Sequence, residues 1–275
     1  MTYATLMVHV ELAQSNAARL AVAGDLAQRW NAAVIGIAAS QPLQMAYADG
    51  FVSGDVMAQD QAQLTQELHT AEAEFRGAMS GRASAVQWRS AITYSRLSDY
   101  FAREARSADL IVTGVGVGDV FSATRSLNTA DLIMRAGRPV LLVPRSAQSA
   151  RLDHALIGWK DSRETRRAVS DALPLLRHAR KVSAVEFAAE TDLAEARRRL
   201  EDLATWLGRH GVPVQCQARL SSGDDATALY AHGQDLQSDV IVAGAYGHSR
   251  LREWVMGGVT RDLLLSNDRC ALLSH

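Results

Sequence analysis

An internal repeat constrains the fold of this chain more than any other feature of its sequence. The segment 107–114, SADLIVTG, matches the segment 237–244, QSDVIVAG. Further along, RPVLL at 138–142 matches RCALL at 269–273, at an offset that is longer by one residue. A self-match at a nearly constant offset of about 130 residues indicates a duplicated domain rather than an array of short repeats.

The length of the chain agrees with such a duplication. Its 275 residues exceed the size of most single domains. A polar stretch without helical or strand periodicity runs from 144 to 151 and separates the two halves. We therefore expect two domains, at residues 1–147 and 148–275.

Within each half, short apolar runs alternate with amphipathic segments, a pattern typical of parallel α/β sheets with helices on both faces. The runs predict five strands per half, at 5–10, 33–38, 85–88, 109–113, 140–143 and at 155–159, 182–187, 214–218, 240–243, 271–273. Helices are predicted at 15–30, 61–79, 97–106, 163–177, 193–210, 227–236 and 251–265, with Pro174 expected to kink or end one of them. The predicted fold is two tandem flavodoxin-like or Rossmann-like domains.

Composition excludes several classes of protein. The chain is 48% hydrophobic, and its 29 basic and 30 acidic residues leave a formal net charge of −1, which does not favour nucleic acid or a membrane surface as a partner. Without an export signal or a long apolar segment, we expect a cytoplasmic protein.

Cys216 and Cys270 fall in predicted strands, where we expect buried, reduced thiols. The eight histidines show no metal-ligand spacing, so no structural metal is expected.

Glycines follow the strand at 240–243 with a regular spacing. Gly244, Gly247 and Gly257 form Gly-x2-Gly-x9-Gly, and the first of them lies where a strand should give way to a helix. Glycine lets the backbone approach a ligand closely, and backbone N–H groups in such turns bind phosphate. The same glycines could instead serve only turns and packing.

The stretch 238–275 resembles the nucleotide-binding signature of the universal stress protein family. The resemblance implies that the second domain binds ATP, with or without Mg²⁺, and that the two halves pair through their last strands like two single-domain relatives. A further homodimer of the tandem chain is left open. The residues that this resemblance places at the nucleotide are Gly158, Trp159, Lys160, Phe187, Ala243, Gly244, Gly247, His248, Gly257, Gly258, Val259 and Thr260. Packing is nevertheless the better interpretation of the large Trp159 side chain.

Two positions depart from the family pattern. Gly258 stands where the family usually has Ser or Thr, which removes one hydroxyl contact to phosphate. Lys160 stands where the family usually has an Asp at the adenosine end, and an ammonium group cannot accept a hydrogen bond. Asp161 could replace the missing acceptor, or Lys160 could meet a phosphate. Ser162 is better explained as a helix N-cap.

The first half has lost most of the signature. Gly114 remains, but Val117 replaces the second glycine, and the second loop reads SLNTA at 126–130. We expect this half to be a degenerate copy that mainly supplies an interface. The favoured function is a regulatory nucleotide-binding protein of the stress response rather than an enzyme. The alternatives are a protein-interaction module with decayed nucleotide sites and a slow ATPase.

Overall fold

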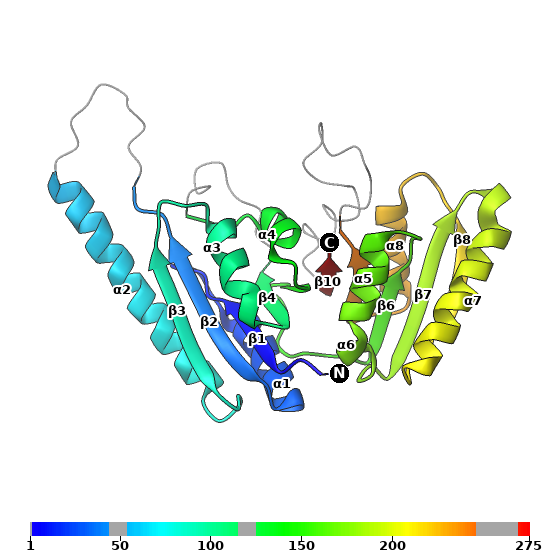
Figure 1. Cartoon of the computed structure of the whole chain (residues 1–275), viewed down its shortest axis with the longest axis horizontal. Helices are drawn as coiled ribbons and strands as arrows, with labels where there is room; N and C mark the ends of the chain where they lie inside the picture. Colours follow the sequence, from blue (N-terminus) through cyan, green and yellow to red (C-terminus); the bar gives the residue numbers. More distant parts are fainter. Residues whose placement is uncertain (1, 44–53, 115–124, 246–268) are drawn as a thin grey trace, which may run out of the picture.

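The computed structural model describes residues 2–43, 54–114, 125–245 and 269–275. Its strands form one sheet of ten, in the order β3-β2-β1-β4-β5-β10-β9-β6-β7-β8 (Figure 1). All neighbouring strands are parallel except β5 and β10, which are antiparallel. The strands are β1 (Thr5–His9), β2 (Ala33–Ser40), β3 (Val86–Ile92), β4 (Leu110–Gly114), β5 (Val140–Val143), β6 (His154–Gly158), β7 (Lys181–Ala188), β8 (Gln215–Leu220), β9 (Val240–Gly244) and β10 (Cys270–Ser274).

Helices cover both faces of this sheet because the inner strands bury apolar side chains on both of their sides, whereas the end strands β3 and β8 contain no buried residue. One hydrophobic cluster joins the sheet to α1 (Ala17–Trp30), α2 (Gly54–Met79), α5 (Arg163–Asp171), α6 (Leu173–Leu176) and α7 (Leu193–Arg209). The other cluster joins it to α3 (Leu97–Glu104), α4 (Thr129–Ala136) and α8 (Asp225–Asp235). In the described part of the chain, no helix has the length and apolar character that crossing a bilayer requires.

The predicted fold class is confirmed, and the strand order refines it. Strands β1 to β5 lie in the order 3-2-1-4-5, and β6 to β10 repeat that order from the other end of the sheet. This is the order of the first five strands of the Rossmann sheet, 3-2-1-4-5-6, whereas a flavodoxin sheet has the order 2-1-3-4-5. All ten predicted strands are present, with boundaries that shift by a few residues.

Among the described residues the helices differ from the prediction in two places, and the predicted helix at 251–265 lies outside those residues. A helix that the sequence analysis missed, α4, begins after Asn128, whose side chain accepts a hydrogen bond from the Asp131 N–H at 3.0 Å, and it ends at Gly137 with φ of 59°. The second helix, α2, begins at Gly54 rather than at residue 61. Pro174 has the expected effect, because α5 ends at Asp171 and the separate short helix α6 follows.

The cysteines correct one expectation. Both thiols are free, but Cys216 is exposed on the edge strand β8 rather than buried. The reason is that β8 ends the sheet, so its side chains have a neighbouring strand on one side only. Burial, followed by the nearby Asp239 carboxylate, raises the pKa of Cys270 to about 12, which keeps that thiol protonated.

The antiparallel pair β5 and β10 joins the two halves into one sheet (Figure 1). Leu141 lies opposite Leu272, and both side chains are buried. A second contact lies at α5, where the Tyr3 hydroxyl donates a hydrogen bond to the Asp171 carbonyl at 2.6 Å. Trp30 and His178 also meet edge to face, with ring centres 5.8 Å apart.

Replacing Leu272 by Ala should lower the free energy of unfolding by about 2 to 5 kcal/mol, because a large buried side chain is lost from the junction of the halves. Urea denaturation followed by circular dichroism measures this change. The matched control is Leu220→Ala on β8, whose side chain is 60% exposed, and its effect should stay within about 0.5 kcal/mol. Equal effects of the two substitutions would contradict the buried junction.

Candidate functional site

The candidate site lies where β6 and β9 run side by side in the second half. From β6 the chain continues to β7 on one side of the sheet, and from β9 it continues to β10 on the opposite side. The strand order therefore reverses between β6 and β9. Ligands of open parallel sheets bind beyond the carboxyl ends of the strands at such a point. Gly158 is the register partner of Ala243, and Trp159 and Lys160 follow directly.

Half of the predicted site residues therefore gather at one edge of the sheet. Phe187 lies near the end of the neighbouring strand β7, and Gly244 ends β9. The other predicted residues, Gly247, His248, Gly257, Gly258, Val259 and Thr260, lie outside the described residues. Their contact with a nucleotide stays a prediction.

The start of α5 lies at the same edge. Ser162 caps this helix, because its hydroxyl accepts a hydrogen bond from the Thr165 N–H at 3.2 Å, which confirms the predicted cap. Asp161 forms an ion pair with Arg166. The acceptor that could have replaced the family's Asp is thus held by an arginine of α5, while Lys160 beside it is exposed.

Gly244 has a packing role that does not depend on a ligand. A Cβ atom at this position would lie 2.5 Å from the Thr165 backbone nitrogen and 2.7 Å from the Glu164 carbonyl carbon. The first half shows a related contact, because a Cβ atom on Gly114 would lie 3.3 Å from Nη1 of Arg19. In both halves, the glycine that ends the fourth strand of the half lies against the first turn of the first helix.

Side chains fill the equivalent place in the first half. The strand register puts His9 and Thr113 where the second half has Gly158 and Ala243. His9 Nδ1 lies 3.0 Å from the Thr113 hydroxyl, and both residues are buried. In the second half Leu229 of α8 packs over Gly158, since a Cβ atom there would lie 2.6 Å from a Leu229 methyl carbon, whereas the first half has a hydrogen-bonded pair at this point.

A buried ion pair completes this closure. Arg19 of α1 lies against Gly114 and pairs with Glu11 at 3.1 Å, with a side chain only 7% exposed. Asn16 fixes the loop before α1, since its side chain accepts from the Glu11 N–H at 2.8 Å and donates to the Glu11 carbonyl at 3.1 Å. The first-half edge is therefore occupied by the protein's own charged groups.

The sequence analysis missed a buried carboxylate close to the site. Glu186 of β7 is 5% exposed and accepts two hydrogen bonds from Arg199 of α7, at 3.0 and 2.6 Å. Its other oxygen, Oε2, and the indole nitrogen of Trp159 are buried without a hydrogen-bond partner among the described residues. A glutamate in the otherwise apolar run 182–187 was the available signal. No group of three potential metal ligands occurs within the described ranges.

The Gly244 contact predicts that Gly244→Ala destabilises the protein by about 1 to 3 kcal/mol, because the added methyl group overlaps backbone atoms of α5. Urea denaturation provides the measurement. Gly208→Ala in α7 is the control: a Cβ atom there meets nothing within 4 Å, and a helical alanine should stabilise by about 1 kcal/mol. A Gly244→Ala protein as stable as the parent would contradict the close approach.

Burial, with a smaller contribution from Arg19, holds the pKa of His9 well below its usual value of 6.5. The folded protein keeps His9 neutral and the unfolded chain takes up a proton, so stability is full above pH 6.5 and is lost as the pH falls below it. His9→Gln should reduce the slope of stability against pH by up to about 1.4 kcal/mol per unit in that range. Urea titrations at several pH values test this, and the exposed His69→Gln should leave the slope unchanged.

Comparison with known proteins supports the fold. No family model and no curated protein match the sequence. Among solved structures, a universal stress protein from Archaeoglobus fulgidus DSM 4304 matches with a TM-score of 0.74 and 11% identity, over 98% of this chain and 95% of that one. A functionally unknown protein from Pseudomonas aeruginosa PAO1 matches with a TM-score of 0.61 and 15% identity, over 99% of this chain and 92% of that one. The chain therefore has the fold of the universal stress proteins.

Proposed function

We propose that this chain is a cytoplasmic universal stress protein that binds one adenine nucleotide in its second half and acts as a regulatory protein rather than as an enzyme. One observation carries the proposal. The predicted site residues within the described ranges gather at the strand-order reversal of the second half, where Gly158 and Ala243 are register partners. The same point of the first half is filled by His9 and Thr113.

The charges at this edge favour the phosphate end of a nucleotide. Lys160 is exposed directly after β6, and Arg163, which pairs with Glu164 at 3.1 Å, begins α5. Asp161 is held by Arg166. Recognition of the base must then rest on backbone groups and apolar contacts, a weaker basis for choosing adenine than a carboxylate would give.

A protein-interaction module remains the second candidate function, because the structure gives Gly244 another reason to be glycine. Its close approach to Thr165 would preserve this residue even in a chain that binds no nucleotide. Gly158 is similar, since a Cβ atom there would lie 2.6 Å from a methyl carbon of Leu229. These two glycines alone therefore do not distinguish the two functions.

Calorimetric titration of ATP, with and without Mg²⁺, into protein stripped of ligand tests the proposal. We expect about one nucleotide per chain and at least tenfold weaker binding by Gly247→Val, because a side chain would block close approach of the backbone to phosphate. The matched control is the reciprocal change Val117→Gly, which should alter nothing because side chains close the first-half edge.

Other outcomes of this titration would each decide a point. Two nucleotides per chain would show that the first half also binds. Absence of binding up to millimolar ATP would favour the interaction module. Thermal melting of both variants keeps a folding defect from being mistaken for a binding defect.

A further inference from the structure

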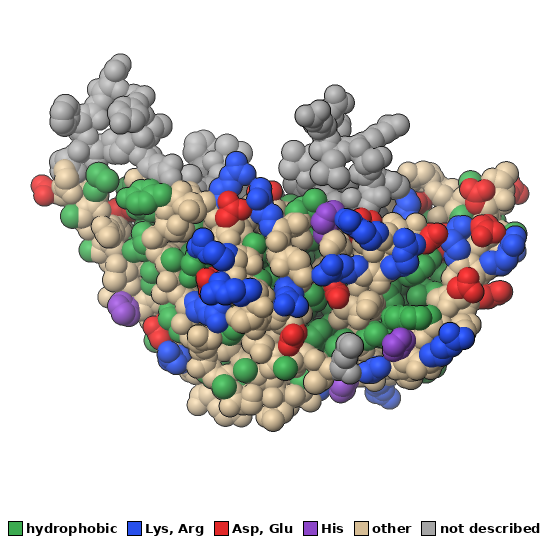
Figure 2. All heavy atoms as spheres, viewed as in Figure 1, with side chains coloured by type: hydrophobic (Ala, Val, Ile, Leu, Met, Phe, Trp, Pro, Cys, Tyr) green, Lys and Arg blue, Asp and Glu red, His purple; other side chains and the backbone are tan. Residues whose placement is uncertain are grey.

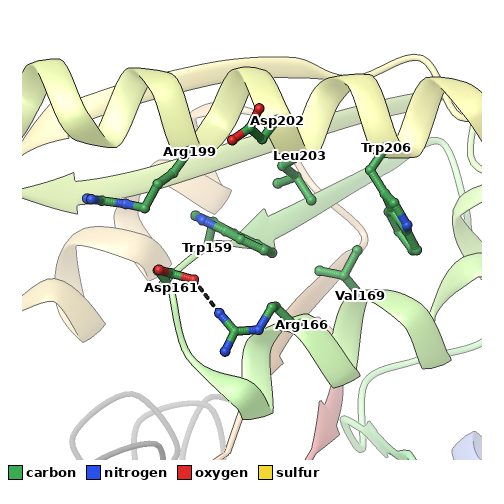
Figure 3. A pocket seen from close by; sticks show the side chains of 8 residues that line it. All are labelled: Trp159, Asp161, Arg166, Val169, Arg199, Asp202, Leu203 and Trp206. Atoms are coloured by element: carbon green, nitrogen blue, oxygen red, sulfur yellow. Dashed lines mark hydrogen bonds and ion pairs between the residues drawn. The ribbon is translucent and has the colours of Figure 1, made fainter.

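A groove of about 440 Å³ lies between α5 and α7 on one face of the second half. Figure 3 shows Trp159 and Trp206 toward its two ends, with Leu203 of α7 between them and Val169 of α5 opposite. Figure 2 shows hydrophobic side chains on this part of the surface, with charged side chains around them. A volume of this size holds a small organic molecule.

The first half shows how this gap between helices is closed when it is not a site. There Glu74 of α2 accepts a hydrogen bond at 3.1 Å from the side-chain amide of Asn16, which precedes α1. This bond ties the two helices together across the gap. Asn16 is the residue at the N-cap position of α1, as Ser162 is of α5.

The second half lacks this bond although it has residues at both places. When the strand registers of the two halves are superposed, Gln87 of β3 corresponds to Gln215 of β8. Glu74 and Asp202 lie the same number of residues before these two glutamines, so they correspond to each other. Asp202 is shorter than Glu74 by one methylene group. Ser162 is also shorter than asparagine, and its hydroxyl accepts from Thr165 instead.

Aromatic volume is also missing from the second half. In the first half, Phe75 and Trp88 lie against each other with ring centres 5.6 Å apart and pack over Gly36. In the superposed strand registers, Cys216 of β8 corresponds to Trp88 of β3. Leu203 lies as many residues before Cys216 as Phe75 lies before Trp88, so Leu203 corresponds to Phe75. Leu203, which lines the groove, is therefore smaller than its first-half counterpart, while Trp159 and Trp206 supply the aromatic rings of the groove.

Among the charged side chains that line the groove, one carboxylate has no partner within the described part of the chain. Asp161 pairs with Arg166, and Arg199 pairs with Glu186. Asp202 is exposed, and within the described part of the chain it has neither a hydrogen bond nor an ion pair. Two indole rings beside an unpaired carboxylate are suited to a planar aromatic cation.

We infer that this groove is a second binding site, for a flat aromatic molecule that carries an amidinium or ammonium group. The ring occupies the space between Trp159 and Trp206, beside Leu203. The cationic group donates to Asp202, as the Asn16 amide donates to Glu74. The groove shares Trp159 with the proposed nucleotide site, but Asp202, Leu203 and Trp206 of α7 line the groove and are not among the nucleotide-site residues.

Three probes of one shape test the inference: naphthamidine, naphthamide and naphthoate, which are a cation, a neutral amide and an anion at neutral pH. Calorimetric titration into the full chain should give about one naphthamidine per chain, with binding at least tenfold tighter than that of naphthoate. Equal binding of the cation and the anion would overturn the role of Asp202. Displacement of naphthamidine by ATP would overturn the assignment of a separate site.

Variants locate the contact. Asp202→Asn should weaken naphthamidine binding about tenfold and leave naphthamide unaffected, because only a charge-assisted hydrogen bond is lost. Glu201→Gln, on the neighbouring exposed residue of α7, is the control with the same change of charge and should bind like the parent. Equal losses in the two variants would indicate general electrostatic attraction and overturn the inference.

A double variant closes the groove rather than disrupting it. Ser162→Asn with Asp202→Glu rebuilds the pair that joins the helices of the first half, where Asn16 donates to Glu74 without capping α1. This protein should stay folded in urea denaturation, slightly less stable than the parent because α5 loses its cap, and it should bind neither naphthamidine nor naphthamide. A folded double variant that still binds both probes would place their site elsewhere.

Discussion

The close approach of the first helix of each half to the end of the fourth strand fixes the edge on which the candidate sites depend. In the second half, α5 lies so near β9 that a side-chain carbon on Gly244 would overlap the backbone at Thr165. Parallel pairing aligns the ends of β6, β7 and β9 beside this contact. In the second half, glycine at this place is thus a requirement of helix packing before it is a property of any ligand site, whereas a Cβ atom on Gly114 would first meet the Arg19 side chain, at 3.3 Å.

Much of the architecture follows from the sequence because parallel strands are buried on both faces and read as continuous apolar runs. The runs ending at Gly114 and Gly244 are of this kind, and they also disclose the duplication. The helix at Thr129–Ala136 escaped prediction because it is short, although Asn128 and Gly137 carry its start and stop signals. The exposure of Cys216 could not be predicted, because a strand at the end of a sheet has the same local pattern as one in the middle.

The candidate site was predictable only in part, for a similar reason. The spacing of Gly158 and Ala243 in sequence gives no sign that they are register partners, and Arg19 gives no sign that it lies over Gly114. These are contacts between distant segments, and they depend on the strand order. The two halves fill this point of the same backbone differently: His9, Thr113 and Arg19 occupy it in the first half, whereas Leu229 packs over Gly158 in the second.

The antiparallel pair β5 and β10 also determines how many strand edges the molecule presents. Two separate five-stranded sheets would have four edges with unpaired backbone groups, whereas the fused sheet has two, β3 and β8. Both innermost strands already have partners on each side. Association of two chains through backbone hydrogen bonds would therefore lengthen the sheet from its ends, and a self-limiting pair of chains would have to form through helix faces or side chains instead.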